Sequence, residues 1–235
     1  MNHEKILRIS LTGTPGCGKS SVSNFIKKSE LSDICILNLT EFVKERNISS
    51  IYDSKRDCLV VDTDALDVEV SNFEIELQKS AESGSAISDF AASDSDLDSN
   101  SDSELSSPLV LLLDSHFSHL LCDISIVLRA DPEVLYSRLS ERNYSVEKIE
   151  ENCEAELLDV ILCEALDLCN CVFEINTTNK SVSDVSKSVL YTIDLISKNP
   201  DAFLSKNTSV YDSPFFPKQY LPGSINWLGE YYDAL

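Results

Sequence analysis

Apolar runs alternate along this chain with stretches in which apolar positions recur at helical spacing. Buried strands are predicted where the apolar residues are nearly continuous, at 6–12, 34–39, 108–114, 123–129 and 171–178. Helical spacing predicts helices at 19–29, 40–46, 64–77, 145–168 and 181–197. Strands that alternate with helices are typical of a parallel sheet with helices on both faces. We therefore expect one α/β domain.

Candidate capping residues mark the start of the helix at 40–46 and of one more helix after the run at 123–129. Asp131 followed by Pro132 is typical of a helix start, because aspartate accepts from free N–H groups and proline fits the first turn. Thr40 is the candidate N-cap of the short helix at 40–46. The stretch at 145–168 is predicted to be a single long helix.

The composition changes abruptly at 80–107, which is rich in serine, aspartate and glutamate and has no lysine or arginine. Such a segment has little apolar surface to offset the entropy of ordering, so we expect a disordered insertion. An acidic arm that is phosphorylated or binds a partner is the alternative. We therefore divide the chain into an α/β domain at 1–199, which contains this insertion, and a C-terminal tail at 200–235.

The chain is strongly acidic, with a formal net charge of −21 and a pI near 4.3. This charge repels nucleic acid and anionic membranes, so broad nonspecific RNA binding is disfavoured. The eight cysteines form no CxxC pair and lie mostly in apolar runs, as expected of buried thiols in a reducing compartment. With no apolar run of membrane-spanning length and no signal-peptide pattern, we expect a cytoplasmic protein, or also a nuclear one in a eukaryote.

The most specific motif is "GTPGCGKS" at 13–20, which matches the phosphate-loop pattern G-x-x-x-x-G-K-[ST] between a strand and a helix. Gly13 and Gly18 let backbone N–H groups turn toward phosphate. Lys19 is expected to reach the β and γ phosphates, and the Ser20 hydroxyl to bind Mg²⁺. The motif predicts these ligands without choosing among the many phosphate-loop families.

A second candidate group is "LLLDSH" at 111–116. Asp114 ends a predicted buried strand and is expected on the Mg²⁺ side of the cleft, with a helix-capping role as the alternative. His116 is a candidate for positioning water or substrate, or for a capping or packing role. His119 is expected to be structural.

Two arginines form the third candidate group. Arg138 and Arg142 lie four residues apart on one predicted helix face and could clamp a transferring phosphoryl group. The alternative is a solvated pair bonded to Glu141 and Glu150. The presence of the phosphate loop favours the functional interpretation for Arg142.

Several stretches together resemble the adenylate kinase isoenzyme 6 family. They are "LTGTPGCGKSS", "YDSKRDCLVVDTDAL", the D-x-H of "LDSHFSHLL", "VLRADPEVLYSRLSERNYSVEKIEEN", "EAELLDVI" and the terminal "YLPGSINW". The resemblance covers about 6–78 and 108–198 together with the terminal motif, which looks archaeal. It implies a phosphate-loop NTPase fold of the NMP-kinase type, with small NMP-binding and lid segments.

The activity implied by the resemblance is transfer of the terminal phosphate of ATP to AMP or a related NMP, with Mg²⁺ as the metal, and ATP hydrolysis. The family also acts in late maturation of the small ribosomal subunit and its rRNA, and binds a ribosomal protein of the S11 type. The resemblance thus implies ATP, an NMP, that ribosomal protein and precursor small-subunit particles as partners. The acidic charge and the lack of a membrane-spanning run predict no membrane partner.

The resemblance also assigns roles to individual residues. Those that match the ATP-binding loop are Gly16, Gly18, Lys19, Ser20 and Ser21. Arg142 matches the lid arginine that contacts ATP, while Asp114 and His116 match the D-x-H in which the histidine supports hydrolysis. The NMP-binding segment corresponds to 38–61 and the lid to 141–151.

The sequence departs from the family pattern at two positions. Asn143 stands where glycine is usual, and asparagine tolerates a left-handed backbone better than most residues, so the lid turn is expected to survive. Lys44 stands where some relatives have arginine, which removes a bidentate contact and weakens the NMP assignment.

Two classes of function stay open at this level. In the first, the chain is an NMP kinase. In the second, it is an assembly ATPase whose acidic surface suits a basic ribosomal protein, and NMP transfer is incidental. The terminal motif and the D-x-H disfavour a small-metabolite kinase. The aromatic tail at 200–235 either docks on the domain or meets a partner, and docking is favoured.

Overall fold

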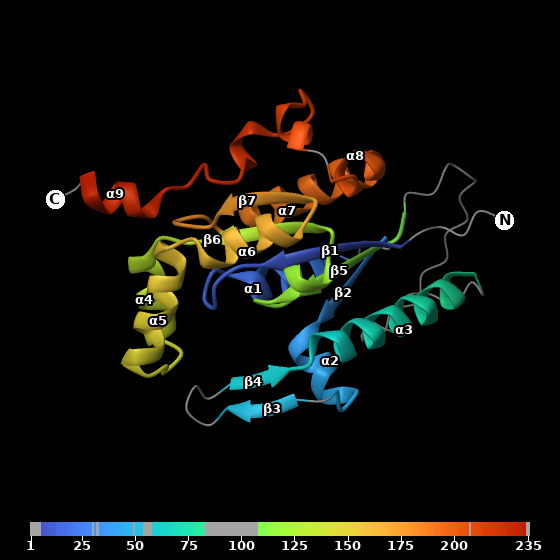
Figure 1. The fold of residues 1–235 in the computed structure, drawn as a ribbon, viewed down its shortest axis with the longest axis horizontal. Helices are drawn as coiled ribbons and strands as arrows, with labels where there is room; N and C mark the ends of the chain where they lie inside the picture. The colour runs from blue at the N-terminus through green and yellow to red at the C-terminus, as the bar shows by residue number, and fades with distance from the viewer. Residues whose placement is uncertain are drawn as a thin grey trace.

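The computed structural model describes residues 6–29, 31, 33–48, 50–53, 58–82, 108–206 and 208–233 (Figure 1). Five parallel strands form its central sheet in the order β2-β5-β1-β6-β7. Their bounds are Leu7–Thr12 for β1, Ile34–Asn38 for β2, Val110–Asp114 for β5, Ile124–Arg129 for β6 and Cys171–Asn176 for β7. The sequence therefore predicted the parallel α/β architecture correctly.

Helices flank this sheet on both faces (Figure 1). The α-helices are α1 Lys19–Lys27, α2 Leu39–Glu45, α3 Thr63–Glu82, α4 Pro132–Ser140, α5 Val146–Leu157, α6 Val160–Leu168, α7 Val182–Lys198, α8 Pro200–Leu204 and α9 Trp227–Asp233. Short 3₁₀ helices are η2 Ser118–Leu121, η3 Thr208–Asp212 and η4 Lys218–Tyr220. Within the described ranges, no helix is both long enough and apolar enough to cross a bilayer.

The two faces of the sheet have separate cores because side chains alternate along each strand. Val110 and Leu112 of β5 pack with β1, α1, α7 and part of the tail. Leu111 and Leu113 of the same strand point the other way and pack with α2 and α3. All five residues of β5 are buried, as the continuous apolar run predicts for a strand covered on both sides.

An antiparallel hairpin stands apart from the main sheet, below α2 and α3 in Figure 1. It consists of β3, Ser50–Asp53, and β4, Cys58–Val61. The hairpin belongs to the segment at 38–61 that the resemblance assigns to NMP binding. After it, α3 continues through Ser80 to Glu82, so these residues are helical rather than the start of the disordered insertion. The rest of that insertion, 83–107, lies outside the described residues.

Three further local predictions were wrong. Arg142 does not share a helix face with Arg138, because α4 ends at Ser140 and Arg142 lies in the turn that follows. The expected helix at 145–168 is divided into α5 and α6 by Asp159, whose backbone is left-handed with φ 56°. The carboxylate of Asp159 pairs with Arg129 on β6, a tertiary contact that helical periodicity does not reveal. The N-cap of α2 is Asn38 rather than Thr40, because the Asn38 side chain accepts from the backbone N–H of Glu41. Asp131 does cap α4, as predicted.

The tail docks along β7, the strand at the edge of the sheet. The ring of Phe216 stacks on Phe173 with their centroids 4.7 Å apart. The backbone N–H of Val172 donates to the Tyr211 hydroxyl at 3.0 Å, so the tail satisfies a donor on this edge strand. Of the two possibilities left open for the tail, the structure shows docking for this part of it.

Candidate functional site

The turn between β1 and α1 has a backbone that only glycine adopts easily. Gly13 has φ +132°, and a Cβ there would lie 2.2 Å from the carbonyl oxygen of Leu128. Gly16 has φ +96°, and a Cβ there would lie 2.6 Å from a methyl group of Leu135. The loop is thus held close to β6 and α4, with the N-terminus of α1 behind it. This arrangement favours a bound anion.

Lys19 begins α1, and its side chain folds across the loop. Its Nζ donates to the carbonyl oxygens of Gly13 at 2.5 Å and Thr14 at 3.1 Å. Burial lowers the pKa of Lys19, while the nearby Asp114 acts in the opposite direction. The ammonium group is therefore positioned at the loop and lines the adjoining cavity.

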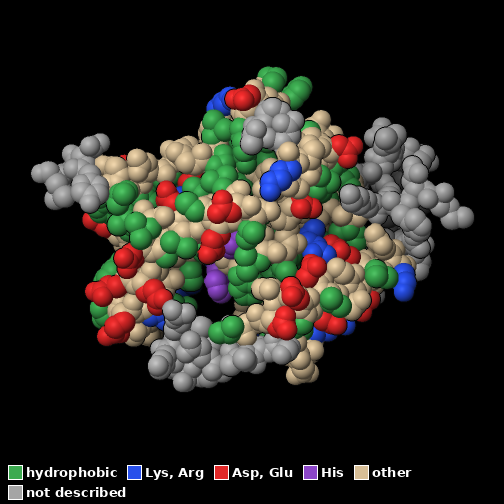
Figure 2. All heavy atoms as spheres, viewed as in Figure 1, with side chains coloured by type: hydrophobic (Ala, Val, Ile, Leu, Met, Phe, Trp, Pro, Cys, Tyr) green, Lys and Arg blue, Asp and Glu red, His purple; other side chains and the backbone are tan. Residues whose placement is uncertain are grey.

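A cavity of about 580 Å³ opens beside this loop. Its lining includes the predicted residues Gly16, Gly18, Lys19, Ser20, Asp114, His116 and Arg142. These residues come from the loop before α1 and the start of α1, from the end of β5 and the loop after it, and from the lid, which are far apart in sequence. In Figure 2, histidine side chains are visible at the edge of a hollow near the centre of the face shown.

Asp114 reaches the cavity because β5 lies beside β1 in the sheet, with Asp114 paired in register to Leu11. Burial raises the pKa of Asp114, and Ser23 and Lys19 oppose that rise. Asp114 and Ser20 offer a carboxylate and a hydroxyl to the same cavity, and both are hard oxygen donors of the kind that Mg²⁺ prefers. The residues present therefore fit a magnesium ion held together with phosphate oxygens.

His116 lies in the loop after β5 and stays exposed to the cavity. The hydroxyl of Thr12 donates to its backbone carbonyl at 3.0 Å, and its ring packs edge-on against Phe117. Desolvation by the cavity walls, followed by the charge of Lys19, lowers the pKa of His116 to about 4. Its imidazole is therefore neutral at pH 7, so one ring nitrogen donates a hydrogen bond and the other accepts one.

His119 has a different environment. It is buried, its Nδ1 hydrogen-bonds with the Thr12 hydroxyl at 3.2 Å, and its Nε2 lies 3.3 Å from a carboxylate oxygen of Glu164. It does not line the cavity that holds His116. These contacts agree with the structural role expected for it.

The two arginines differ in what they contact. Arg138 donates to the carbonyl oxygen of Gly16 at 3.2 Å and so supports the loop from α4. Arg142 lines both the cavity described above and a second one of about 410 Å³. The second cavity is also lined by Gly18, Ser21, Arg138, Thr177 and Val182. Arg142 therefore stands where the two cavities meet beside the loop.

The lid turn has the left-handed backbone that an asparagine at its centre tolerates. Asn143 has φ 57°, which confirms that this position requires a left-handed backbone. Beyond it, Tyr144, Lys148 and Asn152 also line the larger cavity. From the NMP-binding segment, Asn38 lines this cavity, whereas Lys44 is exposed and does not.

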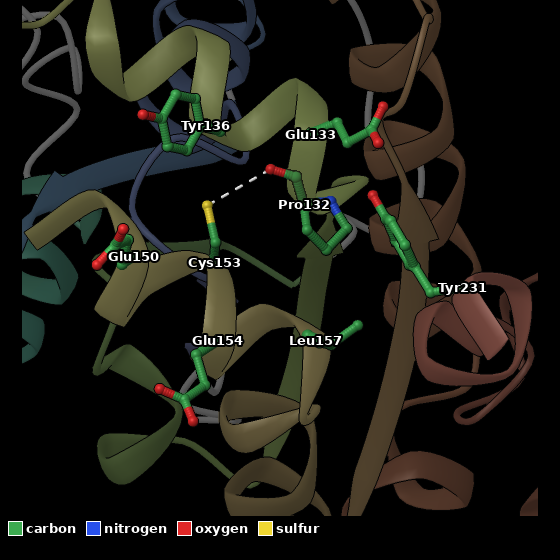
Figure 3. A pocket seen from close by; sticks show the side chains of 8 residues that line it. All are labelled: Pro132, Glu133, Tyr136, Glu150, Cys153, Glu154, Leu157 and Tyr231. Carbon is green, nitrogen blue, oxygen red and sulfur yellow. Dashed lines mark hydrogen bonds between the residues drawn. The ribbon is translucent and has the colours of Figure 1, made fainter. Parts of the chain in front are cut away.

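One buried residue in contact with the loop was not found from the sequence. The carboxylate of Glu156 on α5 accepts from the Thr14 hydroxyl at 2.5 Å and from Arg129 Nε at 2.7 Å. The available signal was a glutamate inside the apolar part of the expected helix at 145–168, but its partners lie on distant segments. A further cavity of about 530 Å³, between α4, α5 and α9, includes none of the predicted site residues (Figure 3).

A glycine-turn loop between β1 and α1, with a lysine on the helix and an aspartate on the neighbouring strand, defines a phosphate-loop nucleotide-binding protein. Residues 9–159 match the protein family described as "AAA domain". Proteins named "Putative adenylate kinase" from Methanosarcina acetivorans and Methanosarcina barkeri are 34% and 36% identical to the chain, covering 94% of it and 97% of each relative.

A protein of the same name from Archaeoglobus fulgidus is 32% identical over 228 residues, which is 97% of this chain and 95% of the relative. The chain belongs to this family of phosphate-loop adenylate kinases, as the motifs predicted. The agreement extends over nearly the whole length of both proteins, so the tail is part of the shared sequence.

Proposed function

We propose that this protein is an adenylate kinase that transfers the terminal phosphoryl group of ATP to AMP or a related NMP, and that it also hydrolyses ATP. The observation that carries the proposal is the single cavity lined by Lys19, Ser20, Asp114, His116 and Arg142 beside the phosphate loop. The family supports it, because its members from three archaea carry the name "Putative adenylate kinase".

Each of the two cavities beside the loop is assigned to part of the nucleotide binding. The phosphates of ATP fit the loop, with Lys19 exchanging its contacts to Gly13 and Thr14 for phosphate oxygens. The smaller cavity, between Arg138, Arg142 and Val182, has room for the rest of ATP. The acceptor NMP fits the larger cavity on the side of Asn38.

In the transfer step, a phosphate oxygen of AMP attacks the γ phosphorus of ATP, and the bond from that phosphorus to the β–γ bridging oxygen breaks. Two ADP molecules result. Lys19 and Arg142 stabilise the negative charge on the transferring group, and the lid excludes water. Ser20 and Asp114 would hold Mg²⁺, which would supply neutralising charge beside the phosphates.

For hydrolysis, water replaces the acceptor phosphate. His116 faces the cavity as a neutral imidazole, with the pKa lowered to about 4, so it orients water through a hydrogen bond rather than holding a proton.

A second candidate function rests on surface charge. We propose that the protein also acts in late maturation of the small ribosomal subunit by binding a ribosomal protein of the S11 type. The net charge of −21 complements a basic ribosomal protein, and acidic side chains are spread over the face shown in Figure 2. In this case ATP hydrolysis would change the affinity for that protein, and NMP transfer would be incidental.

The test measures ADP formation and phosphate release from Mg-ATP, with and without AMP, and with and without the S11-type protein of the same organism. Fast AMP-dependent ADP formation that ignores the ribosomal protein supports the kinase. Slow hydrolysis changed by the ribosomal protein supports the assembly ATPase. The matched control is Lys19→Ala, which is expected to lose both activities, and unchanged turnover in it would exclude the site proposed here.

A further inference from the structure

The docked tail contacts the phosphate loop through one carboxylate. Glu156 is 2% exposed, and its two oxygens serve two distant segments. One oxygen accepts from the hydroxyl of Thr14 in the loop at 2.5 Å, and the other accepts from the indole N–H of Trp227 at 3.2 Å. A single side chain therefore joins the loop that holds ATP phosphates to the first residue of α9.

The carboxylate of Glu156 is held in place by groups on β6 and just after it. Arg129 Nε donates to it at 2.7 Å and the backbone N–H of Ala130 at 3.1 Å. The same guanidinium donates at 2.6 Å to Glu174 on β7, whose other oxygen accepts from the backbone N–H of Ser224 at 2.9 Å. One buried ion cluster thus fixes the tail at two points and the loop at one.

A third tail contact reaches the start of α4. The hydroxyl of Tyr231 on α9 donates to Asp131, the N-cap of α4, at 3.2 Å. Figure 3 shows Tyr231 extending toward Pro132 and Glu133 at this helix start. Because α4 and α5 carry the lid turn between them, the tail contacts both helices that support the lid.

Thr14 links this cluster to Lys19. Its backbone carbonyl accepts from Lys19 Nζ at 3.1 Å, while its hydroxyl donates to Glu156. In the proposed function Lys19 turns to a phosphate and releases that carbonyl, so Thr14 loses one of its two contacts when a nucleotide binds. The Glu156 carboxylate is buried away from solvent, and Trp227 is one of the donors that share it with Thr14.

We propose that the docked tail positions the phosphate loop for nucleotide binding, with Glu156 and Trp227 as positioning residues, and that the environment of Trp227 reports whether the loop is occupied. The inference rests on the proposed function only in requiring that the loop binds a nucleotide. It gives the aromatic tail a part in nucleotide affinity beyond covering the edge of the sheet.

The first experiment uses the fluorescence of Trp227, which is the only tryptophan in the chain. Titration of the full chain with Mg-ADP is expected to change its emission, with a midpoint equal to the Kd from calorimetry. In Thr14→Val the hydroxyl that joins the loop to Glu156 is lost, so saturating Mg-ADP is expected to leave the emission unchanged. An equal emission change in this variant would overturn the inference.

The second experiment separates positioning from general stability. Trp227→Phe keeps an aromatic ring but removes the N–H donor, and is expected to weaken Mg-ADP binding about five- to tenfold. The matched control is Tyr211→Phe, which removes another tail hydrogen bond, to Val172 on β7, with no contact to Glu156. Tyr211→Phe is expected to lower Tm about as much as Trp227→Phe does. Its Kd for Mg-ADP should stay within about twofold of the wild-type value, because the lost contact is remote from the loop.

The outcomes distinguish this inference from the proposed function. Equal Kd values in Trp227→Phe and Tyr211→Phe would mean that the tail only stabilises the domain, and would overturn the inference alone. A wild-type chain that binds no adenine nucleotide would overturn the proposed function and the inference together. Weaker binding in Trp227→Phe, with an intact control, would support both.

Discussion

Removal of Arg129 should be the most damaging single change in the protein outside the phosphate loop. The Arg129 side chain is 2% exposed and pairs with Glu156, also 2% exposed, and with Glu174, 0% exposed. Its third partner, Asp159, is 32% exposed and can turn toward water. Arg129→Met therefore leaves two carboxylates buried without a counter-charge.

The expected loss of unfolding free energy follows from that count. Removing one partner of a buried ion pair typically costs about 3–5 kcal/mol, because the remaining charge stays buried and unpaired. Domains of this kind are stable by about 5–15 kcal/mol in total, so the variant should unfold at much lower urea concentration. Urea unfolding followed by circular dichroism at pH 8 measures the loss.

The pH dependence gives a check on the cause. Burial already raises the pKa of Glu174, and Arg129 opposes this, so the variant should raise it further. A carboxyl whose pKa is higher in the folded state binds protons on folding, and its contribution to stability therefore falls as pH rises through that pKa. The loss should accordingly be smaller at pH 5 than at pH 8.

Two further variants control this prediction. Lys198→Met breaks the exposed pair with Asp194 on α7 and should change the unfolding free energy by less than about 0.5 kcal/mol. Glu174→Gln in the Arg129→Met background should recover part of the loss, because it removes one unpaired charge. A loss below about 1 kcal/mol in Arg129→Met, within the range of ordinary substitutions, would refute the reasoning.

Three further predictions concern the nucleotide site. His116→Ala should lower ATP hydrolysis with the fold intact. In the wild type, the pH–rate profile of hydrolysis should show no histidine inflection near 6.5, because the pKa of His116 is lowered to about 4. An inflection near 6.5 that disappears in the variant would contradict this. Asn143→Gly should leave the KM for ATP unchanged. Asn143→Val should raise this KM, because a β-branched residue at φ 57° costs about 1–2 kcal/mol. Equal KM values in the two variants would argue against a strained lid turn. Gly13→Ala should abolish Mg-ADP binding in calorimetry, since its Cβ would lie 2.2 Å from a backbone oxygen on β6, and retained binding would show that the loop can move away from that strand.

The sequence could predict the features that depend on neighbours in the chain or on strict backbone rules. The glycines and lysine of 13–20 specify a phosphate loop because few other residues tolerate that backbone. Continuous apolar runs specify buried parallel strands, and the order of β5 beside β1 then brings Asp114 to the loop. Asn143 is compatible with the lid turn for a local reason as well, since its side chain tolerates φ 57°.

What only the tertiary structure decided depends on partners far away in sequence. Helical periodicity runs through Asp159 without interruption, yet the helix breaks there, where the carboxylate pairs with Arg129 on β6. In the sequence Glu156 is not distinguished from the other glutamates of its helix, but in the fold its buried carboxylate contacts both Thr14 and Trp227. Hydrogen bonds between residues more than 70 positions apart leave no periodic signal in the sequence, so only the folded chain shows that the tail and the phosphate loop share a carboxylate.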